Sequence, residues 1–199
     1  MELIVSVQGK NSELNTAVIQ DCINAGASMV RTDKPVQCRV PIIGLQKIKV
    51  SNRARVPYIT PMLENVKYVS KWAMYVAVDC RIENRENLVE IFSYATHNNI
   101  KIVADLQKIE DYENIVDQGY VPAFVTTALG IFGSAGMPPY DLMDELIVAG
   151  CENIIAEGNI SSANRIAIIK KKGIDYICIG AAISDPYKLT KQFVRDMLK

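Results

Sequence analysis

Short apolar runs alternate with longer segments of mixed character from one end of the chain to the other. The runs are nearly continuous in their apolar character, which is typical of strands buried on both faces of a parallel sheet. They predict strands at Leu3–Gln8, Ala27–Arg31, Pro41–Leu45, Met74–Asp79, Lys101–Asp105, Ala123–Thr127, Asn153–Glu157 and Tyr176–Gly180. The segments between them predict helices at Ser12–Ala25, Thr60–Val69 with Pro61 at its first position, Asn84–His97, Ile109–Gln118, Pro139–Ala149, Ser161–Lys172 and Pro186–Leu198.

This alternation leaves two architectures, a doubly wound open sheet and a closed barrel. Eight strands favour the barrel, so we expect an α/β fold of the (β/α)8 TIM-barrel type in a single domain over residues 1–199. Because such barrels usually have about 250 residues, this one should be trimmed. Only residues 32–40 separate the second and third strands, and a parallel crossover normally needs about a dozen residues or more. We therefore expect the helix after the second strand to be lost or very short.

Composition narrows the classes of function. The 22 Lys and Arg residues balance the 22 Asp and Glu residues, so the net charge gives no reason to expect binding to nucleic acid or to an anionic membrane. No apolar run reaches the ~20 residues of a membrane-spanning helix, and the first residues lack the basic leader of a signal peptide. The five cysteines are odd in number and include no CxxC pair, so we expect no disulfide framework, no metal site and a cytoplasmic location.

Polar side chains follow most of the apolar runs. In barrels of this type the catalytic groups stand at the carboxyl ends of the strands, so these side chains should gather on one rim. The candidates are Ser6, Gln8, Arg31, Lys47, Asp79, Asp105, Thr126, Thr127 and Glu157.

Lys47 and Glu157 are the candidates for proton transfer. A desolvated lysine can act as a base, form a Schiff base with a carbonyl substrate, or simply attract a phosphate. A carboxylate that faces the lysine across the barrel mouth would complete an acid–base pair.

Small residues follow the last two strands, in Glu157-Gly158-Asn159 and in Gly180-Ala181-Ala182-Ile183-Ser184. Barrels often hold a phosphate between these two loops, where small residues let backbone N–H groups approach the anion. The glycine-containing loop at residues 131–136 should lie over the barrel mouth, as a lid or as a flexible connection.

In order along the chain, these motifs resemble those of the N-acetylmannosamine-6-phosphate 2-epimerases, a family of ribulose-phosphate-binding barrels. The resemblance covers almost the whole chain. No single motif is specific to the family, but the set of motifs in this order is. They are Leu3-Ile4-Val5-Ser6-Val7-Gln8, Val30-Arg31, Ile43-Gly44-Leu45-Gln46-Lys47, Tyr58-Ile59-Thr60-Pro61, Val76-Ala77-Val78-Asp79, Val103-Ala104-Asp105, Thr126-Thr127, Ile155-Ala156-Glu157-Gly158 and Gly180-Ala181-Ala182-Ile183-Ser184.

The resemblance implies a role for each matching position. The catalytic lysine and glutamate of the family fall on Lys47 and Glu157, and residues that contact the sugar fall on Gln8, Arg31 and Asp105. The other rim residues expected to bind substrate are Asp79, Thr126 and Thr127, and backbone groups near Gly158, Gly180 and Ala181 would take the phosphate. The reaction removes the carbon-2 proton beside an open-chain aldehyde and returns a proton to the opposite face, which needs no metal or cofactor. Gln8 and Arg31 are our choice of donors to the aldehyde oxygen.

Three departures from the family pattern alter the binding shell and leave the catalytic positions intact. The segment after Arg31 is shorter, and Asp185 stands where the family usually has an arginine after the phosphate loop. The stretch that reads Ser-Gly-Tyr-Thr in the family is Leu129-Gly130-Ile131-Phe132 here. Lys49, Arg53 and Arg55 are possible substitutes for the missing cation, or simply an exposed basic loop.

The leading hypothesis is an epimerase that inverts carbon 2 of an N-acylated aminosugar 6-phosphate. A lyase or aldolase that uses Lys47 as a Schiff base is an alternative, and so is a degenerate barrel that binds a sugar phosphate or a protein without turnover. The lost helix should expose an apolar strand flank, and a second subunit would cover it, so we expect a homodimer.

Overall fold

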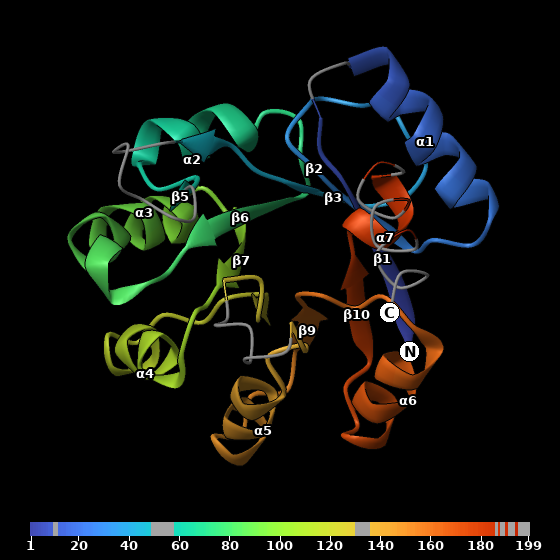
Figure 1. Ribbon diagram of the computed structural model, residues 1–199. Helices are drawn as coiled ribbons and strands as arrows, with labels where there is room; N and C mark the ends of the chain where they lie inside the picture. The colour runs from blue at the N-terminus through green and yellow to red at the C-terminus, as the bar shows by residue number, and fades with distance from the viewer. Residues whose placement is uncertain are drawn as a thin grey trace.

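Eight parallel strands of the described chain close into a barrel, which confirms the predicted architecture (Figure 1). The computed structural model describes residues 1–9, 12–48, 58–129 and 136–185, together with residues 187, 190 and 194. The barrel strands are β1 (Glu2–Val7), β2 (Met29–Thr32), β3 (Ile42–Gly44), β6 (Tyr75–Asp79), β7 (Lys101–Asp105), β8 (Phe124–Thr126), β9 (Ile154–Glu157) and β10 (Tyr176–Ile179). Each pairs with the next along the chain, and β10 closes the ring by pairing with β1.

Helices surround the barrel, and all except the last agree with the predicted segments to within a few residues; the last, a single short turn, was predicted as a loop. They are α1 (Ser12–Asn24), α2 (Leu63–Val69), the 3₁₀ turn η1 (Ile82–Asn84) with α3 (Arg85–His97), α4 (Ile109–Asp117), α5 (Tyr140–Val148), α6 (Ala163–Lys171) and the short α7 (Ala181–Ser184). The prediction for Pro61 was wrong, because α2 begins two residues later and Met62 precedes it in extended conformation. The helix predicted at Pro186–Leu198 lies largely outside the described residues. Within the described chain, none of the helices has the length and apolar character needed to cross a membrane.

The helix after the second strand is absent, as its short sequence predicts. Residues 33–41 run between β2 and β3 without a helical turn. The expectation of an exposed strand flank was wrong, however, because β2 is buried along its whole length. Val36, Cys38 and Val40 pack against the apolar cluster under α1, so the connecting segment itself covers this part of the barrel.

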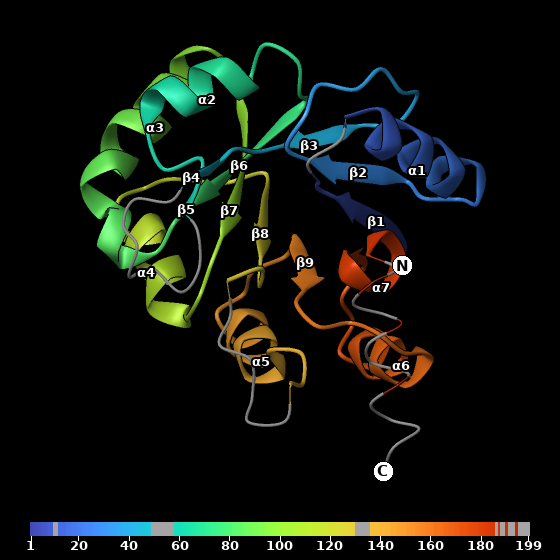
Figure 2. The same cartoon turned by 45° about the horizontal axis from the view of Figure 1, so that its top comes forward.

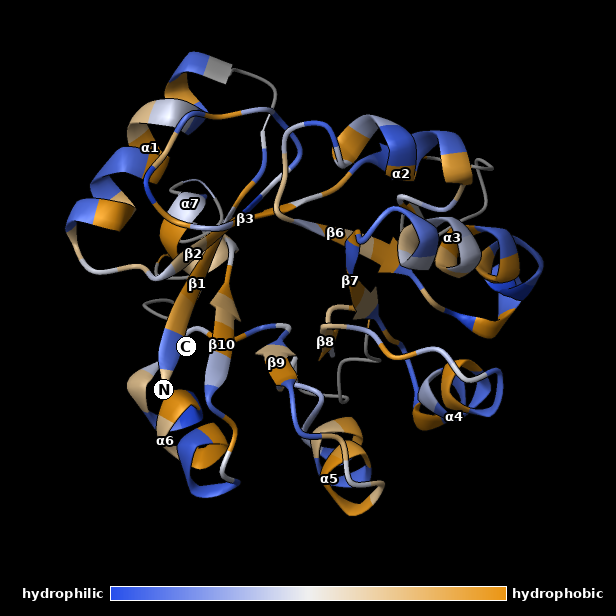
Figure 3. Cartoon of the chain, turned by 180° about the vertical axis from the view of Figure 1, so that it is seen from behind, coloured by the Kyte–Doolittle hydropathy of each residue, from blue (hydrophilic) through white to orange (hydrophobic). Residues whose placement is uncertain are grey.

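The period of two along each strand separates an inner from an outer apolar layer. Val103 on β7 and Ile155 on β9 belong to the inner cluster, whereas their neighbours Ala104 and Ala156 face the helices. Figure 3 shows barrel strands that are largely hydrophobic and surrounding helices in which hydrophilic and hydrophobic residues alternate.

The amino end of the barrel interior is closed by aromatic rings. Phe124 makes edge-to-face contacts with Tyr75 and Tyr176, at centroid distances of 5.5 and 5.1 Å. Further along several of the strands, at the carboxyl end, the inward positions become polar, as Asp105, Thr126 and Glu157 show. Because side chains alternate along a strand, Asp105 shares the inner face with Val103, and Glu157 shares it with Ile155.

Gly44 sets how closely α2 packs against the barrel. A Cβ atom at this position would lie 2.6 Å from the Cβ of Ala73 and 2.6 Å from a methyl group of Val69. Only glycine therefore lets the end of α2 reach β3 this closely.

A second, two-stranded sheet rises from the barrel after β3, and the sequence pattern did not predict it. Its strands β4 (Lys47–Ile48) and β5 (Tyr58–Ile59) are antiparallel, with Lys47 opposite Ile59. Lys47 thus belongs to this excursion and stands beyond the end of β3.

Candidate active site

A cavity of about 480 Å³ opens at the carboxyl ends of the strands. Its volume lies in the range of ordinary small-molecule sites, which is about 300–1,000 Å³. Part of the predicted set lines it, namely Ser6, Gln8, Lys47, Glu157, Gly158, Gly180 and Ala181. The two predicted proton-transfer residues therefore face one shared cavity, although 110 positions separate them in the sequence.

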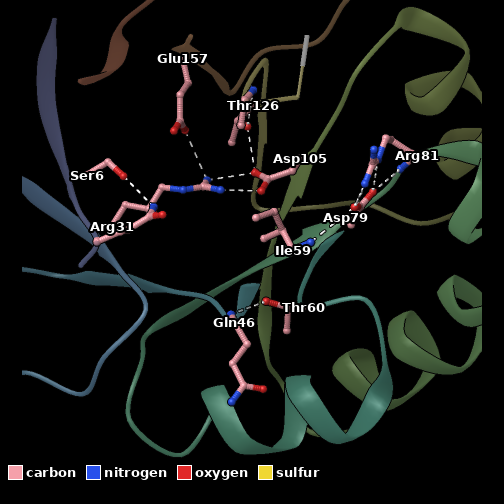
Figure 4. A network of polar contacts seen from close by, with 12 residues as sticks. Ser6, Arg31, Gln46, Ile59, Thr60, Asp79, Arg81, Asp105, Thr126 and Glu157 are labelled. Atoms are coloured by element: carbon pink, nitrogen blue, oxygen red, sulfur yellow. Dashed lines mark hydrogen bonds and ion pairs between the residues drawn. The ribbon is translucent and has the colours of Figure 1, made fainter. Parts of the chain in front are cut away.

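A buried ion cluster forms the floor beside this cavity (Figure 4). The guanidinium of Arg31 donates two parallel hydrogen bonds to the carboxylate of Asp105, at 2.9 and 2.5 Å. One of its nitrogens also lies 3.4 Å from the carboxylate of Glu157. Thr126 donates a hydrogen bond of 2.9 Å to Asp105. The side chain of Arg31 is 3% exposed, so it stands behind Glu157 and is shielded from the cavity.

Charge balance within the cluster depends on Arg31. Burial alone would lower the pKa of the guanidinium, but the nearby Asp105 and Glu157 carboxylates outweigh burial and raise it. Arg31 therefore stays charged and compensates two carboxylates that would otherwise repel each other.

Burial raises the pKa of Glu157 above the ordinary value for a glutamate, and the negative charge of Asp105 adds to this effect. Arg31, the thiol of Cys178 and the ammonium of Lys47 oppose it but do not cancel it. Glu157 is 17% exposed at the cavity wall, so it can accept or donate a proton there. A raised pKa brings a carboxyl group closer to the range where proton transfer in both directions is efficient.

The position of Lys47 is fixed by its neighbours on both sides. The Gln46 backbone carbonyl accepts a hydrogen bond of 2.7 Å from the Thr60 amide, and the Thr60 hydroxyl accepts one of 3.0 Å from the Gln46 amide. Asn65 on α2 donates a hydrogen bond of 3.0 Å to the Gln46 side chain. These contacts hold β4 against β5 and α2, and they present Lys47 to the cavity.

Asp79 lies apart from the cavity wall. Its buried carboxylate accepts hydrogen bonds of 2.9 and 2.6 Å from the Arg81 guanidinium and one of 3.4 Å from the Ile59 amide (Figure 4). Burial raises the pKa of Asp79, and Arg81 partly offsets that rise. Because Ile59 pairs with Lys47 across the small sheet, Asp79 supports the strand next to Lys47.

The threonine pair has two different tasks. Thr126 points into the barrel and binds Asp105, whereas Thr127 binds the backbone of β9. The Thr127 hydroxyl donates to the Glu157 carbonyl at 2.7 Å and accepts from the Glu157 amide at 3.0 Å. Thr127 therefore anchors the main chain that carries Glu157.

Backbone and small polar groups surround the end of the cavity near the last two strands. Gly158 has a φ of +109°, a conformation that glycine adopts without strain, and it turns the chain sharply after Glu157. The short α7 lies beside β1 (Figure 2), where the Ser184 hydroxyl donates to the Ser6 carbonyl at 2.9 Å. Asp185 also lines this end, so a carboxyl side chain stands beside these small residues.

Some predicted features lie outside the described residues. The possible substitute cations Lys49, Arg53 and Arg55 are among them, and so are residues 131–135, which make up most of the loop predicted to lie over the mouth.

Three residues near the site were not among the sequence-based candidates for it. Cys178 stands opposite Glu157 in the β9–β10 register, where its thiol is within hydrogen-bonding reach of the carboxylate. Its position two residues before Gly180 placed it on the inner face, and that signal was available in the sequence. Arg81 could have been inferred from its place just after a buried aspartate. Arg165 lies one turn into α6, and sequence spacing gives no sign of its contacts.

This arrangement can perform proton transfer on a small anionic molecule. An ammonium and a carboxyl group face one cavity, a buried ion cluster contacts the carboxyl group, and the small residues Gly158, Gly180 and Ala181 line one end. Such a set suits deprotonation next to a carbonyl group followed by reprotonation.

Comparison with known proteins agrees with the fold and with the order of motifs. A model for the family described as "Putative N-acetylmannosamine-6-phosphate epimerase" matches residues 16–199. A protein of Malacoplasma penetrans named "Putative N-acetylmannosamine-6-phosphate 2-epimerase" is 28% identical over 97% of this chain and 93% of its own length. A protein of Listeria welshimeri with the same name is 28% identical over 99% of this chain and 92% of its own length.

Solved structures agree in fold. The N-acetylmannosamine-6-phosphate 2-epimerase of Clostridium perfringens superposes with a TM-score of 0.84 at 22% identity, covering 98% of this chain and 93% of that one. The tryptophan synthase complex of Pyrococcus furiosus includes a chain with a TM-score of 0.68 at 14% identity, covering 98% and 95%. Because the family model spans nearly the whole sequence, the chain belongs to the N-acetylmannosamine-6-phosphate epimerase family.

Proposed function

We propose that this protein interconverts N-acetylmannosamine 6-phosphate and N-acetylglucosamine 6-phosphate by inverting carbon 2. The observation that carries the proposal is the presence of Lys47 and Glu157 on the wall of one cavity. Family membership and the names of the relatives support the same reaction.

Inversion needs one proton acceptor and one proton donor on opposite faces of the substrate. In its open-chain form the sugar has an aldehyde beside carbon 2, so loss of the carbon-2 proton gives an enolate. One of Lys47 and Glu157 takes this proton, and the other returns a proton to the opposite face. Each epimer presents its hydrogen to a different face, so the two residues exchange roles when the direction of reaction reverses.

The buried ion cluster influences the pKa of Glu157. Arg31 is hydrogen-bonded to Asp105 and contacts Glu157. We therefore assign it two roles: it positions the catalytic carboxyl group, and its positive charge limits the rise in the pKa of Glu157. Gln8 lines the cavity and remains the candidate donor to the aldehyde oxygen. Its side-chain amide donates to the Ser6 hydroxyl at 2.8 Å, and one N–H of the same amide stays available to the substrate.

The phosphate belongs at the end of the cavity lined by Gly158, Gly180 and Ala181. Their backbone amides can approach an anion closely because no long side chain stands in the way. Asp185 lines the same end and should weaken phosphate binding relative to a protein with arginine there.

The direct test is conversion of purified N-acetylmannosamine 6-phosphate, followed by proton NMR. The wild-type protein should produce N-acetylglucosamine 6-phosphate, and Lys47→Met and Glu157→Gln should each abolish conversion while remaining folded. Lack of conversion by the wild type with either epimer would refute the proposal. Reduction with borohydride in the presence of substrate should leave Lys47 unmodified, and a covalent adduct there would favour a Schiff-base lyase instead.

We further propose a homodimer in the cytoplasm. Tyr68 on α2, Met62 just before it and the nearby Met74 are exposed apolar side chains that a second copy could cover. Five free thiols suit a reducing compartment. Analytical ultracentrifugation at micromolar concentration tests the dimer, and cell fractionation tests the location.

A further inference from the structure

Arg165 on α6 binds the loop that follows the catalytic glutamate. Its Nη1 atom donates to the Asn159 carbonyl at 2.6 Å and to the Ser161 hydroxyl at 3.0 Å. Its Nη2 atom lies 3.7 Å from the Met137 sulfur, in the segment that leads from β8 to α5. Asn159 and Ser161 line the cavity, whereas Arg165 stands behind them.

The loop needs such support because its backbone is unusual. Gly158 has a φ of +109°, and the next residue, Asn159, has a φ of +51°. The second value is in the left-handed region, which costs energy for a residue with a side chain. The bond from Arg165 to the Asn159 carbonyl turns this oxygen toward α6, so it favours the strained conformation.

We propose that Arg165 is a positioning residue for the phosphate group of the substrate, acting through Ser161 and the Asn159 backbone. The proposal rests on the proposed function, since it concerns the same cavity and the same substrate. In this arrangement the Ser161 hydroxyl, bound by the Arg165 guanidinium, recognises the phosphate. The positive charge near the phosphate then comes from α6, because Asp185 places a carboxyl side chain at the other side of this end of the cavity.

The chemistry follows from the direction of the hydrogen bond. Ser161 accepts a hydrogen bond from Arg165 through one of its lone pairs, so its own O–H can donate to a ligand. A hydroxyl whose oxygen is bound by a cation is polarised and becomes a better donor to an anion. The positive charge of Arg165 also counteracts the negative charge that Asp185 brings to this end of the cavity.

Steady-state kinetics with phosphorylated and unphosphorylated substrate separate this role from simple stabilisation of the fold. Arg165→Met should raise KM for N-acetylmannosamine 6-phosphate about tenfold, the size expected for one lost charge-assisted hydrogen bond, with kcat nearly unchanged. With unphosphorylated N-acetylmannosamine the variant and the wild type should have the same kcat/KM. Ser161→Ala should act in the same direction, and Arg165→Lys should be intermediate because lysine keeps the charge but loses the fork.

Lys170→Met is the matched control, because Lys170 is an exposed cation on the same helix, in its last turn. It should leave both substrates unaffected. An equal loss with both substrates in Arg165→Met, or a fall in kcat with KM unchanged, would overturn the positioning role. Should Arg165→Met fail to fold, Ser161→Ala provides the same comparison without removing the clamp.

Binding of inorganic phosphate tests the inference even if no sugar phosphate is converted. Phosphate should raise the Tm of the wild type and of Lys170→Met equally, and Arg165→Met should need about tenfold more phosphate for the same rise. Equal responses from all three proteins would refute the inference about Arg165, whatever the enzyme's substrate proves to be.

Discussion

Replacing Arg31 with methionine should destabilise the protein far more than breaking an equally short ion pair at the surface. The change removes two hydrogen bonds to Asp105 and the contact with Glu157, while keeping most of the buried aliphatic stem. Asp105 is fully buried, so its carboxylate would be left with only the Thr126 hydroxyl near a second, partly buried carboxylate.

The magnitude follows from burial. Removing one partner of a buried ion pair typically costs about 3–5 kcal/mol, because an uncompensated charge stays in a poorly solvated site. For a protein of this size that cost corresponds to a fall of roughly 6–20 °C in Tm. It is a large part of the ~5–15 kcal/mol by which natural domains are stable.

The exposed pair of Lys172 and Asp144 provides the control. Its contact of 2.5 Å equals the shortest contact between Arg31 and Asp105, but its side chains are 19% and 55% exposed. Lys172→Met should therefore cost only about 0–1 kcal/mol. The comparison keeps the distance constant and varies solvent exposure.

Urea denaturation followed by circular dichroism measures both losses at the same pH and salt concentration. Arg31→Lys is the milder variant if Arg31→Met does not fold, and it should lose about 1.5–3 kcal/mol through the missing fork. Equal costs for Arg31→Met and Lys172→Met would refute the claim that the buried cluster holds the site together.

Three further variants test the surroundings of the site. Thr127→Val removes both hydrogen bonds to the Glu157 backbone, so it should lower the free energy of unfolding by about 1–3 kcal/mol and reduce turnover. A loss below about 0.5 kcal/mol in urea denaturation would contradict this. Cys178→Ala removes a thiol that lowers the pKa of Glu157, so the limb of the pH profile of kcat that Glu157 controls should move to higher pH, and a shift to lower pH would be inconsistent. Gly44→Ala places a methyl group 2.6 Å from the Cβ of Ala73 and should cost about 1–3 kcal/mol, whereas an unchanged Tm would show that α2 can move away.

The barrel was predictable because its signals are local and repeated. Each apolar run specifies a strand buried on both faces, and the length of residues 32–40 alone excludes a helix there. The inner-face polar residues were also predictable as a group, because side chains two positions apart on a strand point to the same face. Asp105 therefore points the same way as Val103, and Glu157 the same way as Ile155.

The roles within the group depended on three-dimensional pairing and could not be predicted. Asp79 and Asp105 both end an apolar run, yet one binds Arg81 outside the cavity and the other binds Arg31 beneath it. The small sheet that carries Lys47 was missed because a two-residue strand has no periodicity to detect. Arg165 was missed because its contacts depend on how α6 sits against the preceding loop.

Lys47 and Glu157, on our proposal, exchange the carbon-2 proton of one sugar phosphate from opposite faces. Proton NMR in D₂O, starting from N-acetylmannosamine 6-phosphate, follows this exchange. The wild type should place deuterium at carbon 2 of the N-acetylglucosamine 6-phosphate product, and Lys47→Met and Glu157→Gln should make no product. Product that keeps its original carbon-2 hydrogen, or full conversion by either variant, would contradict the proposal.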